Sequence, residues 1–359
     1  MRKVGVVAGR SAIGLDIGTS GVRAAELSFG KSQVTLEKFG QVALPEGAVR
    51  DGEVVDPAAV GEAIKQLWTH TKFSGKKVII GVANQKVIVR QVDLPWLPDG
   101  ELRSALGYQV QDLVPMPVEH AVLDFFTLEE FTNDTGGRMR RGMLVAASRE
   151  MVMNAVHAVQ KAGLTATSVD LSSFAVLRSL AAQDNLGMGA EVEALVDVGA
   201  RVTNIVVHQG GAPRFIRILL MGGQDLTDAV SERMGVAGSQ AEAMKQEIGL
   251  RTDIPEGALI ASRVIEAAAV TFVDEVRGSL DYYEASTGST RISKLVLTGG
   301  GARLVGLADR LQSATRVPVV VGNPMDRLAL GRTGLSPEQI EFVQPLAVVP
   351  VGLALGAAS

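Results

Sequence analysis

The chain has 359 residues, of which 47% are hydrophobic and 21% charged, and its formal net charge is −4. This length and apolar content can build a large core and two or three domains, and the acidic balance argues against a general nucleic-acid binder. The absence of cysteine excludes disulfides, thiolate catalysis and cysteine-bound zinc, and four histidines with no four-residue spacing argue against a histidine metal site.

The first predicted element is a β-hairpin over Ala12–Leu27, in which a strand delivers Asp16 into the turn Gly18-Thr19-Ser20-Gly21. Glycines let a turn approach a ligand closely, and turn N–H groups that face one way hold an anion. A carboxylate beside such a turn repels phosphate, so the pattern favours a cation between them, as in a magnesium–nucleotide site. Taken alone, the pattern is equally typical of an ordinary glycine-rich hairpin.

Further strands are predicted at Val34–Leu44, Lys76–Ala83 and Val87–Leu94. Between them, Asp56 is a suitable N-cap for a helix that begins at Pro57. The predicted order of helices and strands then changes. Two helices and three strands are predicted at Asp99–Leu113, Ala121–Glu129, Arg141–Ala147, Glu150–Lys161 and Leu164–Val169. This series interrupts a βα pattern, so we expect a small inserted subdomain at about 95–165.

The motif of the first hairpin recurs half a chain later. A helix, a loop and two strands are predicted at Ser172–Ala182, Asn185–Gly189, Ala194–Val198 and Val202–Val207. The third of these segments delivers another acid, so that Asp197 and Gly199 stand as Asp16 and Gly18 do in the first hairpin. The recurrence predicts two domains of the same topology whose acid-bearing turns face one cleft.

Two features of the next segment are candidates for ligand contact. The predicted strand Arg214–Leu220 leads through Gly222 and Gly223 into a helix, Asp225–Met234, and a helix N-terminus attracts anions. The helix Gln240–Ile248 places Glu242 and Lys245 on one face, which by itself is typical of a surface ion pair.

The last third of the chain begins with the longest predicted helix, Leu259–Ser286, with Ile260, Val264, Ala268 and Phe272 as its core-facing stripe. The strand Ile292–Thr298 then runs into Gly299-Gly300-Gly301 and a helix, Val305–Ala314. Successive glycines let a backbone lie flat against a ligand, although the spacing is not G-x-G-x-x-G. A final strand, Pro318–Val321, precedes a buried terminal helix at Pro345–Ala358 that is too short to span a membrane.

Together these motifs resemble the actin-like ATPase superfamily, whose phosphate-1 loop, phosphate-2 loop and adenosine motif correspond to Asp16–Arg23, Asp197–Thr203 and Leu297–Leu304. Within it the chain is similar to the PilM family of type IV pilus assembly, itself related to the division protein FtsA. The similarity is carried by the opening I-G-L-D-I-G-T-S-G-V-R-A-A-E-L and by the segments Glu101–Phe125, Gln240–Lys245 and Val319–Met325.

The resemblance implies an α/β, ribonuclease H-like fold of two actin-like domains with a small inserted subdomain. The implied division is 1–94 and 166–190 for the first domain, 95–165 for the insert, 191–345 for the second domain, and 346–359 for a helix that packs back on the first domain.

The resemblance also implies a site for ATP or ADP with Mg²⁺, in which Asp16 and Asp197 hold the metal, mostly through water. The implied phosphate-binding residues are Gly18, Thr19, Ser20, Arg23, Gly199, Ala200 and Thr203, with Gly222, Gly223 and Asp225 at phosphate or ribose. The implied ribose and adenine contacts are Glu242, Lys245, Gly299, Gly300, Gly301, Arg303 and Asn323.

Three residues depart from the family pattern. Arg23 stands where a lysine is common, and Met325 where an aromatic residue is usual. Gln109 stands where relatives often carry a glutamate, so it is the candidate to orient a hydrolytic water, and the rate of any weak ATPase activity stays open.

The family resemblance implies a cytoplasmic scaffold at the inner membrane, which binds the short cytoplasmic N-terminal tail of a PilN-like membrane protein and other pilus assembly proteins, but no nucleic acid. We expect the tail at the edge of Val87–Leu94 or against the helix near Leu102–Leu113. One alternative is a sugar kinase of the superfamily, for which Asp93, Asp124 and Asp170 are candidate bases. Another is a protein that forms actin-like filaments.

Overall fold

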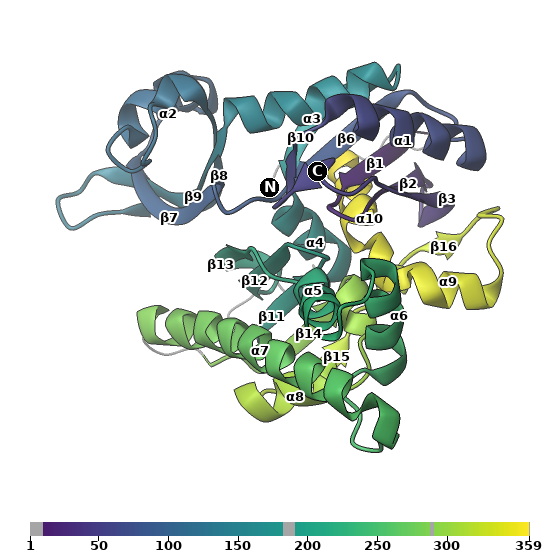
Figure 1. Ribbon diagram of the computed structural model, residues 1–359. Coiled ribbons are helices and arrows are strands. Elements are labelled where there is room, and N and C mark those ends of the chain that lie inside the picture. The colour runs from purple at the N-terminus through teal and green to yellow at the C-terminus, as the bar shows by residue number, and fades with distance from the viewer. Residues whose placement is uncertain (1–9, 182–190, 288–290, 359) are drawn as a thin grey trace.

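The computed structural model describes residues 10–181, 191–287 and 291–358, so the expected loop Asn185–Gly189 lies outside the described residues. Two larger sheets and one small sheet form the frame of the molecule (Figure 1). A fourth sheet among the described residues is a short antiparallel pair, β4 (Val49–Arg50) and β5 (Glu53–Val54), which was not predicted. None of the described helices combines the length and the apolar character needed to cross a bilayer.

The first domain is built on a six-stranded sheet with the order β10-β6-β1-β2-β3-β16. Its strands are β1 (Arg10–Ile17), β2 (Gly21–Phe29), β3 (Val34–Ala43), β6 (Lys77–Val82), β10 (Thr165–Leu171) and β16 (Ala329–Leu330). The first three form an antiparallel meander, and β6 and β10 follow in parallel with β1. Helices α1 (Pro57–Thr71) and α3 (Arg149–Lys161) cover this sheet, and α1 starts as predicted, because Asp56 accepts the amides of Ala58 and Ala59.

The second domain repeats this connectivity in a five-stranded sheet with the order β13-β12-β11-β14-β15. Its strands are β11 (Val192–Val198), β12 (Thr203–Gln209), β13 (Ala212–Leu219), β14 (Lys294–Thr298) and β15 (Val319–Val321). Again an antiparallel meander is followed by two parallel strands. The repeated acid–glycine motif therefore predicted the duplication correctly.

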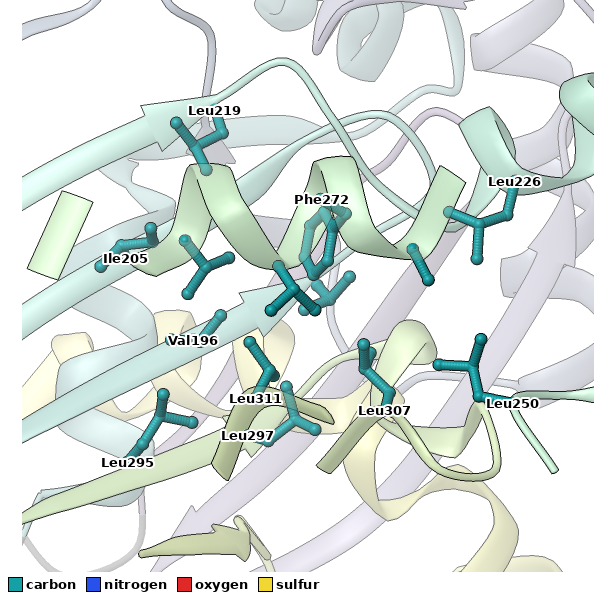
Figure 2. Close-up of a cluster of buried hydrophobic side chains, with 14 of the residues drawn as sticks. Val196, Ile205, Leu219, Leu226, Leu250, Phe272, Leu295, Leu297, Leu307 and Leu311 are labelled. Atoms are coloured by element: carbon teal, nitrogen blue, oxygen red, sulfur yellow. The ribbon is translucent and has the colours of Figure 1, made fainter. Parts of the chain in front are cut away.

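Helices of the second domain are α5 (Gly223–Met234), α6 (Gly238–Ile248), α7 (Leu259–Thr287) and α8 (Leu307–Thr315). Figure 2 shows core side chains of α5, α7 and α8 packed against those of β11, β12 and β14, with Phe272 at the centre. One part of the predicted stripe on α7 is wrong, because Ile260 is 59% exposed. The buried face instead follows Ala261, Ile265 and Ala269 to Phe272 and Val276, and the stripes diverge because the helix has 3.6 residues per turn.

A three-stranded antiparallel sheet stands apart from the two larger ones, with the order β7-β9-β8 (Figure 1). It consists of β7 (Ile88–Pro95), β8 (Ala121–Thr132) and β9 (Arg138–Ser148), and α2 (Asp99–Val110) packs on it through Leu102, Leu106 and Val110. The sequence analysis grouped β7 with the first domain and α3 and β10 with the insert. In the structure β7 belongs to this small sheet, whereas α3 and β10 pack in the first domain.

Helices α4 (Ser172–Leu180) and α10 (Val348–Leu355) join the two domains, and Figure 1 shows them between the two larger sheets. Their apolar side chains form one cluster with Leu195, Val206 and Val296 of the second sheet. A Cβ at Gly352 would stand 1.8 Å from the carbonyl oxygen of Ala175, so glycine is required for this close helix contact. The remaining helix, α9 (Pro337–Val343), precedes α10 and packs on the outer part of the first sheet.

Candidate functional site

The two glycine-rich hairpin turns have matching geometry. The amide of Gly18 donates to the Gly21 carbonyl at 3.0 Å, and the amide of Gly199 donates to the Val202 carbonyl at 2.9 Å. Each turn follows a strand in which the acid stands one residue before the last, at Asp16 in β1 and at Asp197 in β11. The duplication of the fold therefore extends to the hydrogen bond that shapes each turn.

Both turns line one cavity of about 620 Å³ between the two domains, a volume typical of ligand sites. The predicted residues that line it are Asp16, Gly18, Thr19, Ser20, Arg23, Asp197, Gly199, Ala200, Gly222, Gly223, Glu242, Lys245, Gly299, Gly300, Gly301 and Arg303. Thr203, Asp225, Asn323 and Gln109 are not among its lining residues. The structure thus brings together residues from both halves of the chain that the sequence connected only by motif.

Asp16 pairs with Arg23, which stands opposite it in the β1–β2 register, at 3.7 Å between Oδ2 and the guanidinium. Burial raises the pKa of Asp16 above its ordinary value, and the charge and hydrogen bond of Arg23 act in the opposite direction. The guanidinium also donates to the Ser20 hydroxyl at 3.4 Å, while its Nε is buried without a hydrogen-bond partner. Arg23 therefore fixes the first acid and has spare donor capacity inside the cavity.

Asp197 is only 7% exposed and forms no ion pair with a basic side chain among the described residues. Burial raises its pKa to about 7, and the nearby charge of Asp16 adds to this, while a 3.1 Å hydrogen bond from Asn204 and the charge of Arg23 act against it. Two carboxylates thus lie near one guanidinium, and the charge of Asp16 disfavours the ionised form of Asp197.

The excess of negative charge at Asp16 and Asp197 favours binding of a divalent cation. The described residues contain no cluster of three or more histidine, cysteine or acidic ligands. Mg²⁺ does not require one, because it keeps several waters and is usually bound by one or two carboxylates together with phosphate oxygens. The residues present at Asp16 and Asp197 therefore fit Mg²⁺.

The N-terminal amides of helix α5, which were expected to bind an anion, donate to protein acceptors instead. The amide of Gly223 donates to the Gly199 carbonyl at 2.9 Å, and the amide of Gln224 donates to the Ala200 carbonyl at 2.7 Å. The amide of Gly222 donates to the Asp225 carboxylate at 2.7 Å. The first amides of α5 are therefore occupied in holding the second turn and in capping the helix.

Two predicted phosphate contacts have structural partners beside the cavity. The Thr203 hydroxyl donates to the Met221 carbonyl at 2.7 Å, and Asp225 pairs with Arg201 at 2.9 Å. The first interaction ties the second hairpin to the loop before α5, and the other ties it to the first turn of α5. These side chains support the second turn from behind.

Glu242 and Lys245 do line the cavity, but Lys245 is nearly buried. Its Nζ donates to the Gly223 carbonyl, the Thr227 hydroxyl and Glu242 at 2.9, 2.9 and 2.6 Å. Burial acts to raise the pKa of Glu242, yet hydrogen bonds from Lys245, Thr227 and Gln246 lower it below its ordinary value. The pair is thus the cross-link between α5 and α6 rather than a loose surface ion pair.

The glycines of the predicted adenosine motif are explained by close packing against β11. Gly299 has a positive φ of 81°, and a Cβ there would stand 2.5 Å from the Val198 carbonyl oxygen. A Cβ at Gly301 would stand 2.3 Å from the Val198 side chain. Arg303 stacks over the ring of Phe342 in α9 at 3.5 Å, and this pair closes the cavity across the two domains.

The remaining candidates lie outside the cavity. Gln109 lies in α2, which packs on the small sheet. The side-chain oxygen Oδ1 of Asn323 accepts the amide of Met325 at 3.0 Å. Asp93 and Asp170, candidate kinase bases, pair with Arg141 and Arg178. Asp124, the third, accepts the amide of Phe125 at 2.9 Å. None of these acids lines the cavity.

Sequence reasoning missed several lining residues, among them Gln41, Gly81, Ser172, Asn204, Gln246 and Phe342. Asn204 could have been predicted from the sequence. It stands seven residues after Asp197, as Arg23 stands seven after Asp16, so an alignment of the two hairpins would have found it. Phe342 carries no motif, because its place depends on how the end of the chain returns to the cavity.

Comparison with known proteins identifies relatives over nearly the whole chain. A family model described as type IV pilus assembly protein PilM matches residues 14–358. A solved structure named as a PilM–PilN type IV pilus biogenesis complex is 27% identical, with a TM-score of 0.83 over 97% of this chain and 98% of that one. The cell division protein FtsA of Bacillus subtilis is 23% identical over 356 residues, which is 87% of this chain and 78% of that protein.

The fold alone extends to more distant proteins. MreB5 of Spiroplasma citri, solved bound to ADP, is 14% identical with a TM-score of 0.51 over 97% of this chain and 96% of that one. The duplicated architecture and these neighbours establish the actin-like fold.

Proposed function

The chain belongs to the family of the type IV pilus assembly protein PilM, and we propose that it serves there as a scaffold that binds magnesium and ATP or ADP between its two domains and holds the tail of a membrane-protein partner. The observation that carries the nucleotide proposal is the pair of acid–glycine turns that face one cavity. The structurally similar MreB5 is described as bound to ADP, which supports an adenine nucleotide as the ligand.

Each side chain has a distinct role in this proposal. Asp16 and Asp197 hold the cation, mostly through water, and the turns at 18–20 and 199–200 surround the phosphates. Bound Mg²⁺ supplies positive charge between these carboxylates and the phosphates. Arg23 offers its remaining donors to a phosphate oxygen, since its Nε has no partner within the described residues. Arg303 and the glycines of 299–301 border the adenosine.

We propose that holding a nucleotide matters more than hydrolysing it. Gln109, the candidate to orient a hydrolytic water, lies in α2 and not at the cavity. The sugar-kinase alternative has weak support for the same reason, because Asp93, Asp124 and Asp170 all lie elsewhere. Filament formation remains an alternative, and sedimentation with ATP is its test.

The proposed partner is the cytoplasmic N-terminal tail of a PilN-like membrane protein, since a similar structure is named as a complex of PilM with PilN. Strand β7 is an edge of the small sheet, and an exposed edge can pair with an extended peptide. A hollow of about 560 Å³ beside β7 is lined also by Ile216 and Ile218 of β13. Helix α2, where Tyr108 is 80% exposed, is the second candidate surface. Through this tail the protein would sit at the cytoplasmic face of the inner membrane.

Calorimetry with a synthetic tail peptide tests the partner proposal and separates the two surfaces. Arg90→Asp should weaken binding if the tail lies along β7, and Tyr108→Ala should weaken it if the tail lies on α2. Ile260→Ala, an exposed apolar position on α7, is the control and should leave binding unchanged. No binding by the unaltered chain, with or without Mg-ATP, would contradict the proposal.

A further inference from the structure

Ser173, Asn204 and Asp197 form a buried hydrogen-bonded chain at the edge of the cavity. The Ser173 hydroxyl donates to Asn204 Oδ1 at 2.9 Å, and Asn204 Nδ2 donates to Asp197 Oδ2 at 3.1 Å. Ser173 is 0% exposed, Asn204 4% and Asp197 7%. Water therefore has little access to compete for these groups, and each bond depends on the next.

The chemistry of the three groups permits one direction for this chain. An ionised carboxylate only accepts hydrogen bonds, so the NH₂ group of Asn204 must face Asp197. The amide oxygen then faces Ser173, whose hydroxyl must donate to it. A half-turn of the Asn204 amide would put two oxygens against each other at the ionised Asp197, which disfavours that rotamer. The Ser173 hydroxyl, which donates to the amide oxygen, stabilises the observed rotamer from the other side.

The two acids thus have partners of different charge at the same register position. Asp16 faces Arg23, whose positive charge offsets part of its own, whereas Asp197 faces a neutral amide. A neutral donor orients a carboxylate without cancelling its charge. The attraction of Asp197 for a cation is therefore kept, while its rotamer is fixed.

From this geometry we propose that Asn204 is a positioning residue for Mg²⁺ binding, which aims Asp197 at the cation, and that Ser173 in turn fixes Asn204. This inference rests on the magnesium–nucleotide function proposed above and deepens it. It assigns to Asp197 the larger share of the metal interaction and to Asp16 the smaller one.

The chain of bonds also crosses between the domains. Ser173 lies in the first turn of α4, which follows β10 of the first sheet, whereas Asn204 and Asp197 lie in the second sheet. A movement that separates α4 from β12 would release the Asn204 amide. The orientation of the Asp197 carboxylate therefore depends on the packing of the two domains against each other.

The test is calorimetry of ATP binding by the full chain, once with millimolar Mg²⁺ and once with excess EDTA. The ratio of the two affinities measures the metal contribution. Loss of a partner that orients a metal ligand costs roughly tenfold or more in metal affinity, so Asn204→Leu should lower the ratio by that factor. Ser173→Ala should lower the ratio in the same sense, by less, because the amide only gains a second rotamer.

Ser179→Ala is the matched control. Ser179 is another buried serine of α4, it donates to the Val348 carbonyl at 2.6 Å, and its own side chain does not line the cavity. Ser179→Ala should leave the ratio of the two ATP affinities unchanged, even if it lowers the melting temperature as much as Ser173→Ala or more. An unchanged ratio in Asn204→Leu and Ser173→Ala, or equal weakening with and without Mg²⁺, would overturn the inference. Absence of ATP binding by the unaltered chain would instead overturn the proposed function itself.

Discussion

Arg23 and Asn204 occupy equivalent positions in the two halves of the molecule, each opposite the acid of its own hairpin. Arg23 reaches its acid with a charge at 3.7 Å, and Asn204 reaches its acid with a neutral donor at 3.1 Å. The two halves therefore share a backbone plan but differ in charge where they meet. This difference leaves one guanidinium, that of Arg23, beside the two aspartates, and a bound cation would balance the remaining negative charge.

The pKa of Asp197 predicts a pH dependence of stability. Because the folded-state pKa of Asp197, about 7, lies above the ordinary value of 3.8, folding favours the protonated form. Its contribution is fully present below the unfolded pKa and is lost as the pH rises through 7. The free energy of unfolding of the unaltered chain, relative to Asp197→Asn, should thus fall between about pH 5 and about pH 8 in urea titrations.

Magnesium–nucleotide binding should show the complementary effect. The cation needs the ionised carboxylate, so binding below pH 7 should release a proton from Asp197, and calorimetry in buffers of different ionisation enthalpy would detect it. Asp197→Asn serves as the reference that removes the titration of the nucleotide itself. A stability difference that stays constant across this pH range would contradict the account.

Gly222 and Gly223 should differ sharply in their tolerance of a side chain. A Cβ at Gly222 would stand 2.3 Å from the Gly199 carbonyl oxygen, whereas at Gly223 the nearest atom is Lys245 Nζ at 3.5 Å. Gly222→Ala should push the second turn out of place, cost about 1–3 kcal/mol in urea denaturation and weaken nucleotide binding. Gly223→Ala is the control, and equal effects of the two changes would show that the loop is not held against the turn.

The contact between α4 and α10 should be equally sensitive. Gly352→Ala would bring its Cβ to 1.8 Å from the Ala175 backbone and should lower the melting temperature, because neither helix can move without separating the two domains. Gly278 in α7 is exposed and has nothing within 4 Å of its Cβ position. Gly278→Ala should therefore raise stability by about 0.5–1 kcal/mol, through helix propensity. Two changes of the same sign would refute this interpretation.

Local pattern was sufficient to predict the duplicated sheets. Strands β1 and β11 are apolar runs that end on an acid and a glycine, and that signal needs no tertiary information. The Asp56 cap of α1 is equally local. The stripe on α7 was misjudged at Ile260, because the burial of a helix face depends on which neighbours cover it.

The site was harder to predict where residues act through their neighbours. Gly222 was expected at phosphate, but the structure uses it for close approach of α5 to the second turn, a demand set by the packing of two loops. Lys245 was expected at the ligand, and its three internal acceptors come from two helices whose crossing the sequence does not specify. Residues whose place is set by their own turn, such as Asp16 and Gly18, do line the cavity into which the two turns were predicted to face.

The most direct test of the account is calorimetry of Mg-ATP binding to the unaltered chain, Asp16→Ala and Asp197→Ala, with circular dichroism to verify folding. The account predicts that both variants remain folded and bind Mg-ATP more weakly, with the larger loss in Asp197→Ala. Affinity equal to that of the unaltered chain in both folded variants would contradict the two-acid site.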